Sequence, residues 1–192
     1  MSEEGQSPVY TWCHWAKANQ NGAAPIHLLE HHLADVGACF EALVAQPTIR
    51  RRLAHTANCD DLDRTTVSRL AVFAALHDVG KVNTGFQTQI WCDRELQDGY
   101  RPTRAGHTSD LVPVLLRDDH STSEWFCDAI GWNAHMAHWD ADDGRTASAL
   151  FVAALSHHGK PLDLYNPPQR NPRIWRSTAD STPADAPNGL AP

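Results

Sequence analysis

An apolar helix that ends in a histidine–aspartate pair constrains the fold of this chain more than any other feature. Between residues 65 and 76, apolar side chains recur at three- and four-residue steps, which is typical of a helix with one buried face. These side chains are Val67, Leu70, Ala71 and Ala74. The same face continues to His77 and Asp78, so the last turn of the helix is expected to deliver both groups to the interior or to the floor of a cleft. Thr65 or Thr66 is expected to cap the helix.

The side chains at this helix end favour metal chemistry. An imidazole nitrogen and a carboxylate form a mixed ligand set that suits iron, manganese, cobalt or nickel, with magnesium as a further possibility. Gly80 lets the backbone turn sharply, and Lys81 then places a positive charge where it can meet a phosphate. A His-Asp dipeptide alone would mean little, so the remaining histidines decide the interpretation.

A second amphipathic helix is predicted from Pro25 to about Pro47. Its apolar stripe consists of Leu29, Leu33, Val36, Phe40 and Leu43. His32 lies at the rim of this stripe and is expected to face inward, whereas His31 points about 100° away and is expected to be exposed.

Two later helices carry histidines in the same manner. His107 opens an apolar stretch that continues through Leu111–Leu116, and residues 147–158 form a strong amphipathic pattern that ends in His157, His158 and Gly159. The segment 47–64 is polar and predicts a loop or short helix. No two-residue alternation predicts a strand, so the fold expected is mostly helical.

These histidines form a candidate metal site. Imidazoles occur at the ends of four apolar stripes: His32, His77 beside Asp78, His107, and His157 with His158. Each one alone is explained well by a structural role, but buried imidazoles each need a partner, and a shared metal would satisfy several of them. A structural zinc site would instead favour cysteines. His135 and His138 are expected to be structural or exposed.

Composition limits the class of protein. The chain has 192 residues, 42% of them hydrophobic, and a net charge of −7, which disfavours independent binding of long nucleic acid. We expect one domain over residues 1–165 and a proline-rich tail over 166–192. The five cysteines contain no C-x-x-C pair, no apolar run is long enough for a membrane span, and the polar N-terminus does not read as a signal peptide. A cytoplasmic protein that does not enter a membrane is expected.

The ordered motifs resemble the HD phosphohydrolase superfamily. More closely, they resemble the HD nuclease domain of the CRISPR type I helicase-nuclease. The similar stretches are Cys13-His-Trp-Ala-Lys17, Ile26-His-Leu-Leu-Glu-His-His-Leu-Ala-Asp-Val36, Ala75-Leu-His-Asp-Val-Gly-Lys81 with Phe86-Gln87, Gly106-His107, and Ser156-His-His-Gly159.

The resemblance implies an all-α HD-domain helical bundle with a metal site at the ends of several helices. It implies that His32, His77 and Asp78 hold one divalent metal, and that Asp78 bridges to a second held by His107, His157 and His158. It also implies cleavage of single-stranded DNA supplied by a helicase domain or subunit and by the CRISPR RNA-guided surveillance complex. Asp78 and Lys81 would then be catalytic, with Lys81 stabilising charge on the phosphate.

One ligand of the family pattern has no clear counterpart. The family completes its first metal site with an aspartate on a late helix of Ala-Asp-Trp type, and here only Asp180, in different surroundings, offers that side chain. No Walker motif of a helicase follows. Two alternatives therefore stay open: an HD phosphohydrolase acting on small nucleotides, and a truncated, non-catalytic docking module.

Overall fold

The computed structural model describes residues 15–17, 27–87, 89, 103–113, 127–128, 130–139, 145–164 and 174. This part of the chain is mostly helical, as the sequence predicts. Its elements are β1 (Trp15–Lys17), β2 (His27–Leu28), α1 (Leu29–Val44), α2 (Pro47–Thr56), α3 (Arg64–Ala75), η1 (Leu76–Val82), α4 (Thr84–Gln87), η2 (Ser109–Leu111), α7 (Trp132–Trp139) and α8 (Arg145–Leu155).

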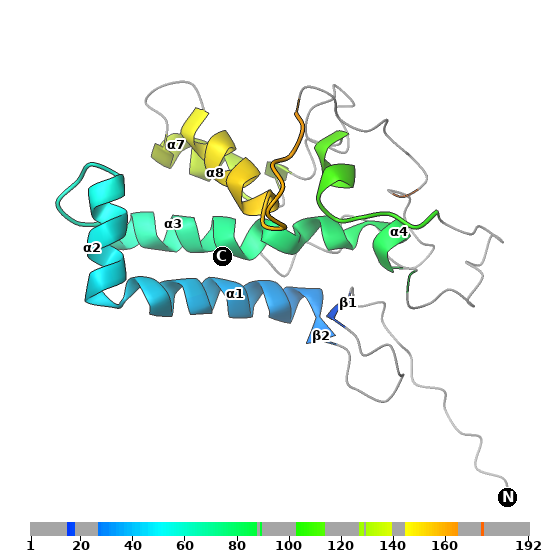
Figure 1. Cartoon of the computed structure of the whole chain (residues 1–192), viewed down its shortest axis with the longest axis horizontal. Coiled ribbons are helices and arrows are strands. Elements are labelled where there is room, and N and C mark those ends of the chain that lie inside the picture. The colour runs from blue at the N-terminus through cyan, green and yellow to red at the C-terminus, as the bar shows by residue number, and fades with distance from the viewer. Residues whose placement is uncertain are drawn as a thin grey trace, which may run out of the picture.

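Helices α1 and α3 form an antiparallel pair that supports the rest of the domain (Figure 1). Gly37 lies at their contact, where an added Cβ would be 3.6 Å from both the carbonyl oxygen of Ala71 and the Cβ of Ala75. The small side chains at this contact let the two backbones approach closely. The buried stripe of α1 ends at Val44, and Leu43 is 55% exposed, so the predicted inward position of Leu43 was wrong. The stripe continues one residue later because α2 covers Val44 with Ala54.

The cap of α3 also differs from the prediction. Asp63, not Thr65 or Thr66, is the N-cap residue, and its carboxylate accepts hydrogen bonds from the backbone N–H and the hydroxyl of Thr66. These contacts with Thr66 hold the pKa of Asp63 below its usual value. Aspartate and threonine are both good capping residues, and Thr66 serves the cap as a donor instead of as the cap itself. The polar segment before α3 contains the short helix α2, with Pro47 in its first turn.

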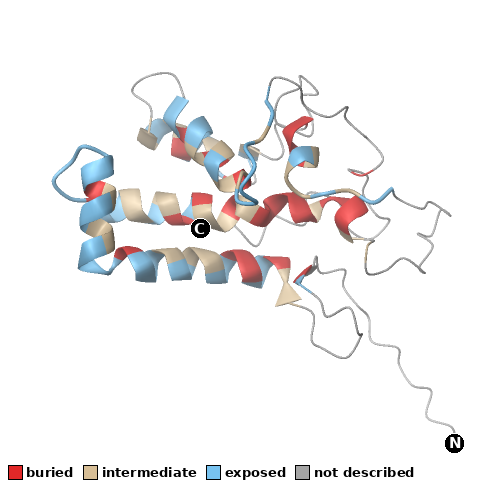
Figure 2. Cartoon of the chain, viewed as in Figure 1, coloured by how far each residue is buried: buried red, intermediate tan, exposed pale blue. Residues whose placement is uncertain are grey.

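The helical segment that carries the His-Asp pair is wound more tightly than predicted, as a 3-10 helix instead of the last turn of an α-helix. The α-helix stops at Ala75, and His77 and Asp78 lie in the 3-10 helix η1. Figure 2 shows the buried residues concentrated where α3 and η1 meet α8. The main core cluster consists of Phe73, Leu76, Val79, Leu111, Ile130, Ala147, Phe151 and Leu155. This core fixes η1 against α8, which places the His-Asp pair at the edge of a rigid interior.

Two short strands, which the sequence did not predict, accompany the helices. β1 and β2 pair antiparallel, with Trp15 opposite Leu28 and Lys17 opposite His27. Strands of three and two residues are too short to show an alternating pattern in the sequence. The pairing brings the buried Ala16 beside Leu29 and Leu33 at the start of α1.

The candidate ligand histidines after α4, which are His107, His157 and His158, lie outside α-helices. His107 precedes the short 3-10 helix η2, and the helix predicted through Leu116 can be followed only to residue 113, where the described range ends. α8 ends at Leu155, and His157 and His158 occupy the turn that follows instead of the last helical turn. Gly159 has a φ of +72°, which agrees with its predicted role in ending the helix.

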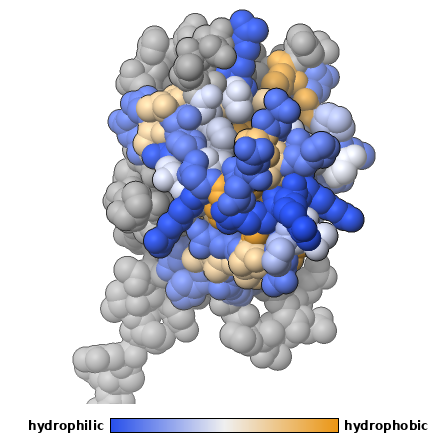
Figure 3. Space-filling view, turned by 90° about the vertical axis from the view of Figure 1, so that its left-hand side faces the viewer, coloured by the Kyte–Doolittle hydropathy of each residue, from blue (hydrophilic) through white to orange (hydrophobic). Residues whose placement is uncertain are grey.

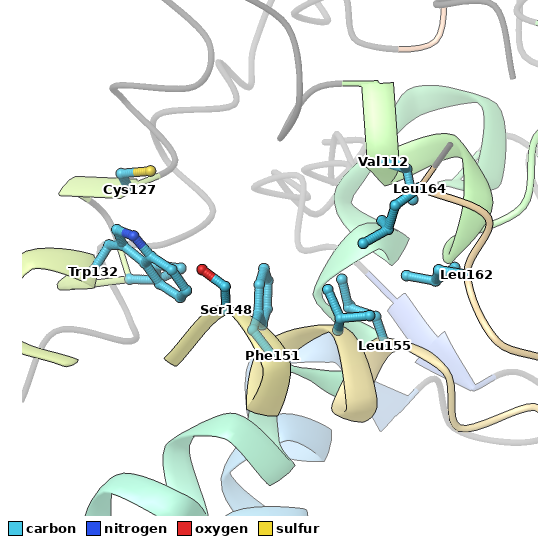
Figure 4. Close-up of a pocket in the computed structure, with 10 residues that line it drawn as sticks. Val112, Cys127, Trp132, Ser148, Phe151, Leu155, Leu162 and Leu164 are labelled. Atoms are coloured by element: carbon cyan, nitrogen blue, oxygen red, sulfur yellow. The ribbon is translucent and has the colours of Figure 1, made fainter. Parts of the chain in front are cut away.

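An apolar pocket of about 250 Å³ lies beside α8 (Figure 4). Phe151, Leu155, Leu162 and Trp132 contribute to its walls, and no candidate metal ligand lines it. We therefore assign this pocket to the core. No helix within the described ranges has the length and apolarity needed to cross a membrane.

Some predictions fall outside the described residues. The boundary at residue 165 stays a prediction, since Ile174, which is buried, is the one described residue of the segment 166–192. Asp180 also lies outside the described ranges.

His135 predicts a pH dependence of stability. It is 4% exposed, its ring lies 4.8 Å from that of Phe73, and its Nδ1 has no hydrogen-bond partner in the described part of the chain. Burial, aided by Arg69 and His138, lowers the pKa of His135 to about 4. Because the unfolded chain binds this proton near pH 6.5, unfolding is favoured as the pH falls from about 6.5 toward 4.

Urea denaturation at pH 7 and pH 5 measures this effect. His135→Leu removes the titrating group, so we expect it to lose less stability than the wild type over this interval. His31→Leu, a change at an exposed position of α1, is the matched control and should keep the wild-type slope. Equal slopes for all three proteins would contradict the prediction. His135 is buried, His138 contacts Thr66, and neither belongs to the two groups of candidate ligands among the described residues.

Candidate metal centre

Asp78 lies at the centre of the histidines singled out in the sequence. Its Oδ2 atom is 2.9 Å from Nε2 of His32 and 3.2 Å from Nε2 of His77. Its Oδ1 atom is 3.0 Å from Nε2 of His107 and 3.4 Å from Nε2 of His157. The carboxylate thus faces a different pair of imidazoles with each oxygen.

These residues divide into two groups with ligand spacing. His32, His77 and Asp78 form one, and His107, His157 and His158 form the other; within each group the ligand atoms lie within 4.8 Å of one another. Nε2 of His107 and Nε2 of His158 are 3.0 Å apart. The structure therefore brings together all six predicted ligand residues, although the sequence spreads them from residue 32 to residue 158.

The two groups differ in exposure. His32 and Asp78 are buried and His77 is half-buried, whereas His157 and His158 are exposed and His107 is half-buried. Among the described residues, His157 and His158 thus form the solvent-exposed side of the centre.

Backbone carbonyls orient two of the imidazoles. Nδ1 of His77 donates to the carbonyl of Ala74 at 2.9 Å, and Nδ1 of His157 donates to the carbonyl of Ala154 at 3.2 Å. Both carbonyls belong to the preceding helical turn, three residues back. A histidine that donates from Nδ1 keeps the lone pair of Nε2 for a metal, and metal-binding histidines are commonly held in this way.

The Asp78 carboxylate is strongly favoured as an anion. Burial alone would raise the pKa of Asp78, but the contacts with His107, His77 and Lys81 outweigh it and hold the pKa well below its usual range. Burial lowers the pKa of His32 and of His157. For His77, the effect of burial is outweighed by the adjacent Asp78 carboxylate, which raises the pKa of the imidazole.

Lys81 is buried and contacts Asp78 directly. Its Nζ atom donates to Oδ2 of Asp78 at 2.6 Å and to the carbonyl of Ala16 at 3.2 Å. Within the described residues Lys81 thus neutralises and positions the carboxylate. The contact with a phosphate expected from the sequence stays a prediction.

Sequence reasoning missed Asn83, which fixes the segment that carries His107. The side-chain amide of Asn83 donates to the carbonyls of Gly80 and Gly106, at 2.7 and 2.8 Å, and its oxygen accepts from the N–H of Phe86 at 2.8 Å. An asparagine two residues after Lys81 gives no periodicity or motif signal of its own. Its role depends on the folded structure, which places the carbonyls of Gly80 and Gly106 next to each other.

Asn83→Ala is expected to lower the free energy of unfolding by about 3 kcal/mol, because it removes three side-chain hydrogen bonds made by a buried residue, although Gly80 and Phe86 keep their backbone bonds to residue 83. Urea denaturation monitored by circular dichroism measures this loss. The matched control is Asn58→Ala, at an exposed turn with φ of +54°, where the change should cost less. A loss at Asn83 no larger than at Asn58 would show that the junction is not held by this amide.

The donor set fits bound metal ions. Since Nδ1 of His77 and of His157 donate to carbonyls, their Nε2 lone pairs face the oxygens of Asp78, an arrangement that requires a cation, either a proton or a metal. Oδ1 of Asp78 is buried and, although Nε2 of His107 lies 3.0 Å away, it makes no well-aligned hydrogen bond within the described residues. Two ligand nitrogens each about 2.1 Å from one ion lie about 3 Å apart, close to the separation of His107 and His158.

A helical core that presents a His-Asp pair and further imidazoles around one carboxylate defines an HD domain. The family model described as "Cas3, HD domain" matches residues 15–186. The chain therefore belongs to the Cas3 HD domain family, the HD nuclease domain of Cas3-type CRISPR effectors. No curated protein and no solved structure matches the chain, so this assignment rests on the family model and the fold.

Proposed function

We propose that this chain is a metal-dependent nuclease domain that hydrolyses phosphodiester bonds of single-stranded DNA in CRISPR type I interference. The observation that supports the proposal best is Asp78, a buried carboxylate with one oxygen toward each group of ligands. Bound divalent metals would supply Lewis acidity, which activates water and stabilises negative charge on phosphate oxygens.

The protein's own residues prepare this chemistry. Asp78 and the imidazoles of His32 and His77 form the buried side of the centre, and Lys81 holds the carboxylate in place. His157 and His158 leave the other side open. We propose that the scissile phosphate approaches from the open side.

Delivery of the strand by partners agrees with the charge of the chain. A net charge of −7 gives little general attraction for a long polyanion. We propose that a helicase domain or subunit, working with the RNA-guided surveillance complex, supplies the single strand. Of the candidate metals, iron, manganese, cobalt and nickel suit a set rich in imidazole best.

The test is cleavage of circular single-stranded DNA by the purified chain, with each metal added separately and with a chelator as the control. Metal-dependent opening of the circle is expected, because it requires cleavage within the strand. Release of phosphate from small nucleotides without opening of the circle would favour the nucleotide phosphohydrolase. No turnover of either substrate, with one metal or fewer per chain, would favour a non-catalytic docking module.

A further inference from the structure

A second pocket, with polar residues in its lining, lies away from the metal centre at the start of α3. It has a volume of about 520 Å³, and α3, α7 and the residues just before α7 form its walls. Its polar lining residues are Arg64, Thr65, Ser68, Arg69 and His135. None of the residues that line it is acidic.

Two buried nitrogen atoms of this lining are unsatisfied. Nε of Arg69 and Nδ1 of His135 are buried, and neither has a hydrogen-bond partner among the described residues. His135 is more than nine-tenths buried, and its ring packs against Phe73, which fixes its position in the wall. A buried guanidinium N–H without an acceptor is costly. Both nitrogens are closed to solvent, so a ligand in the pocket would give Arg69 an acceptor once its guanidinium turns toward the ligand.

Two carboxylates close to the start of α3 already have hydrogen-bond partners. Asp63 caps α3 through Thr66, and Glu41 accepts a hydrogen bond from Ser68 at 3.2 Å. The nearby arginine Arg50 on α2 is paired with Asp61. Arg64 is exposed, and Arg69 is half-buried. The described lining thus carries two arginines and no carboxylate, in a chain that is acidic overall.

From this geometry we propose that the pocket formed by Arg64, Arg69 and His135 binds a phosphate group of the single DNA strand, outside the metal centre. Guanidinium groups match tetrahedral phosphate oxygens well because their N–H groups form a planar fork. Arg69 and His77 are eight residues apart along α3 and η1, which corresponds to roughly 12 Å at the helical rise. A strand only a few nucleotides long can therefore reach both places.

This inference rests on the proposed nuclease function for the identity of the strand, but the pocket can be tested without cleavage. The first experiment measures the affinity of fluorescein-labelled dT15 by anisotropy, with a chelator present so that no metal is bound. Arg69→Gln is expected to weaken binding about tenfold, and Arg64→Gln severalfold, since each removes a charge-assisted contact. Arg52→Gln, which removes the same charge from an exposed position on α2, is the control and should stay within about twofold. Figure 3 shows the end of the molecule that carries α2, where hydrophilic residues dominate the surface.

A second measurement needs no variant. Titration of the wild-type chain with inorganic phosphate should shift the Nε–Hε resonance of Arg69 in the NMR spectrum, ahead of those of Arg51 and Arg52. Loss of affinity in Arg69→Gln no larger than in Arg52→Gln, or an unmoved Arg69 resonance, would overturn the proposal. A shift with phosphate but unchanged dT15 affinity in Arg69→Gln would overturn the assignment to a strand.

The two proposals fail separately. If the wild-type chain cleaves circular DNA but Arg69→Gln binds dT15 as tightly as Arg52→Gln does, the proposed phosphate pocket is refuted and the nuclease proposal stands. If the wild-type chain cleaves no substrate but its affinity for dT15 depends on Arg69, the nuclease proposal is refuted and the proposal of a phosphate pocket stands.

Discussion

Replacing Asp78 with asparagine is expected to abolish metal binding at both ligand groups and to lower the cleavage rate by about 10²–10³-fold or more. The substitution keeps the shape of the side chain but removes the one negative charge that both groups share. A loss of this size is comparable with the removal of a single well-placed electrostatic group from other active sites. Metal per chain, measured by mass spectrometry after dialysis, and opening of circular single-stranded DNA are the two readouts.

The same substitution leaves the buried ammonium of Lys81 without its counter-charge. Breaking a buried ion pair typically costs about 3–5 kcal/mol, whereas replacing both partners with neutral groups costs much less. The double variant Asp78→Asn/Lys81→Met is therefore expected to regain stability without regaining metal. This variant separates loss of the site from loss of the fold.

Asp35→Asn is the matched control for Asp78. Asp35 also contacts a histidine, since its Oδ2 atom is 3.3 Å from Nε2 of His27, but its side chain is 67% exposed. We expect wild-type metal content and cleavage for this variant. If the Asp78 double variant folded and retained two metals per chain, the proposed role of the carboxylate would be wrong.

Gly80→Ala is expected to lower the free energy of unfolding by about 3 kcal/mol and to disturb one ligand group selectively. An added Cβ at Gly80 would lie 1.8 Å from the carbonyl oxygen of His107 and 2.8 Å from its carbonyl carbon. Because both are backbone atoms, the segment that carries His107 has to move, and overpacking of this kind is destabilising. A loss of this size in a chain of this length corresponds to roughly 6–12 °C in the thermal midpoint.

Gly37→Ala is the matched control for Gly80. At Gly37 an added Cβ meets its neighbours at 3.6 Å, an ordinary contact, and alanine favours the helix by up to about 1 kcal/mol. Gly80→Ala should lose the metal of His107, His157 and His158 while keeping part of the affinity at His32, His77 and Asp78. Thermal unfolding and metal content test this together. An unchanged midpoint, with two metals retained, would contradict the expectation.

Much of the fold and of the candidate site follows from the pattern of apolar residues. The stripes of α1, α3 and α8 identify the buried faces, and histidines at the ends of those stripes are therefore brought toward one another around Asp78. His32 is buried as expected, and His31 is exposed. Periodicity works here because each helix buries one continuous face against another helix.

The junctions between helices could not be predicted in this way. The change from α-helix to 3-10 helix at Leu76, the cap by Asp63 and the clamp by Asn83 depend on hydrogen bonds between segments that are distant in the sequence or on local competition among similar side chains. Helical periodicity places His157 and His158 in the last turn of α8, but the backbone leaves the helix two residues earlier. The two imidazoles still converge on the candidate centre, because the turn brings His157 to Asp78 and His158 to His107.

The unequal exposure of the two ligand groups has a kinetic consequence. A metal held by His32, His77 and Asp78 can leave only when buried side chains move, whereas His157 and His158 lie at the surface. Opening of a surface turn costs far less free energy than opening of the core. With a chelator in excess, metal release is therefore expected in two phases, a fast one from the surface group and a slow one from the buried group. In a stopped-flow trace the fast phase should disappear in His158→Ala, and the slow phase should remain.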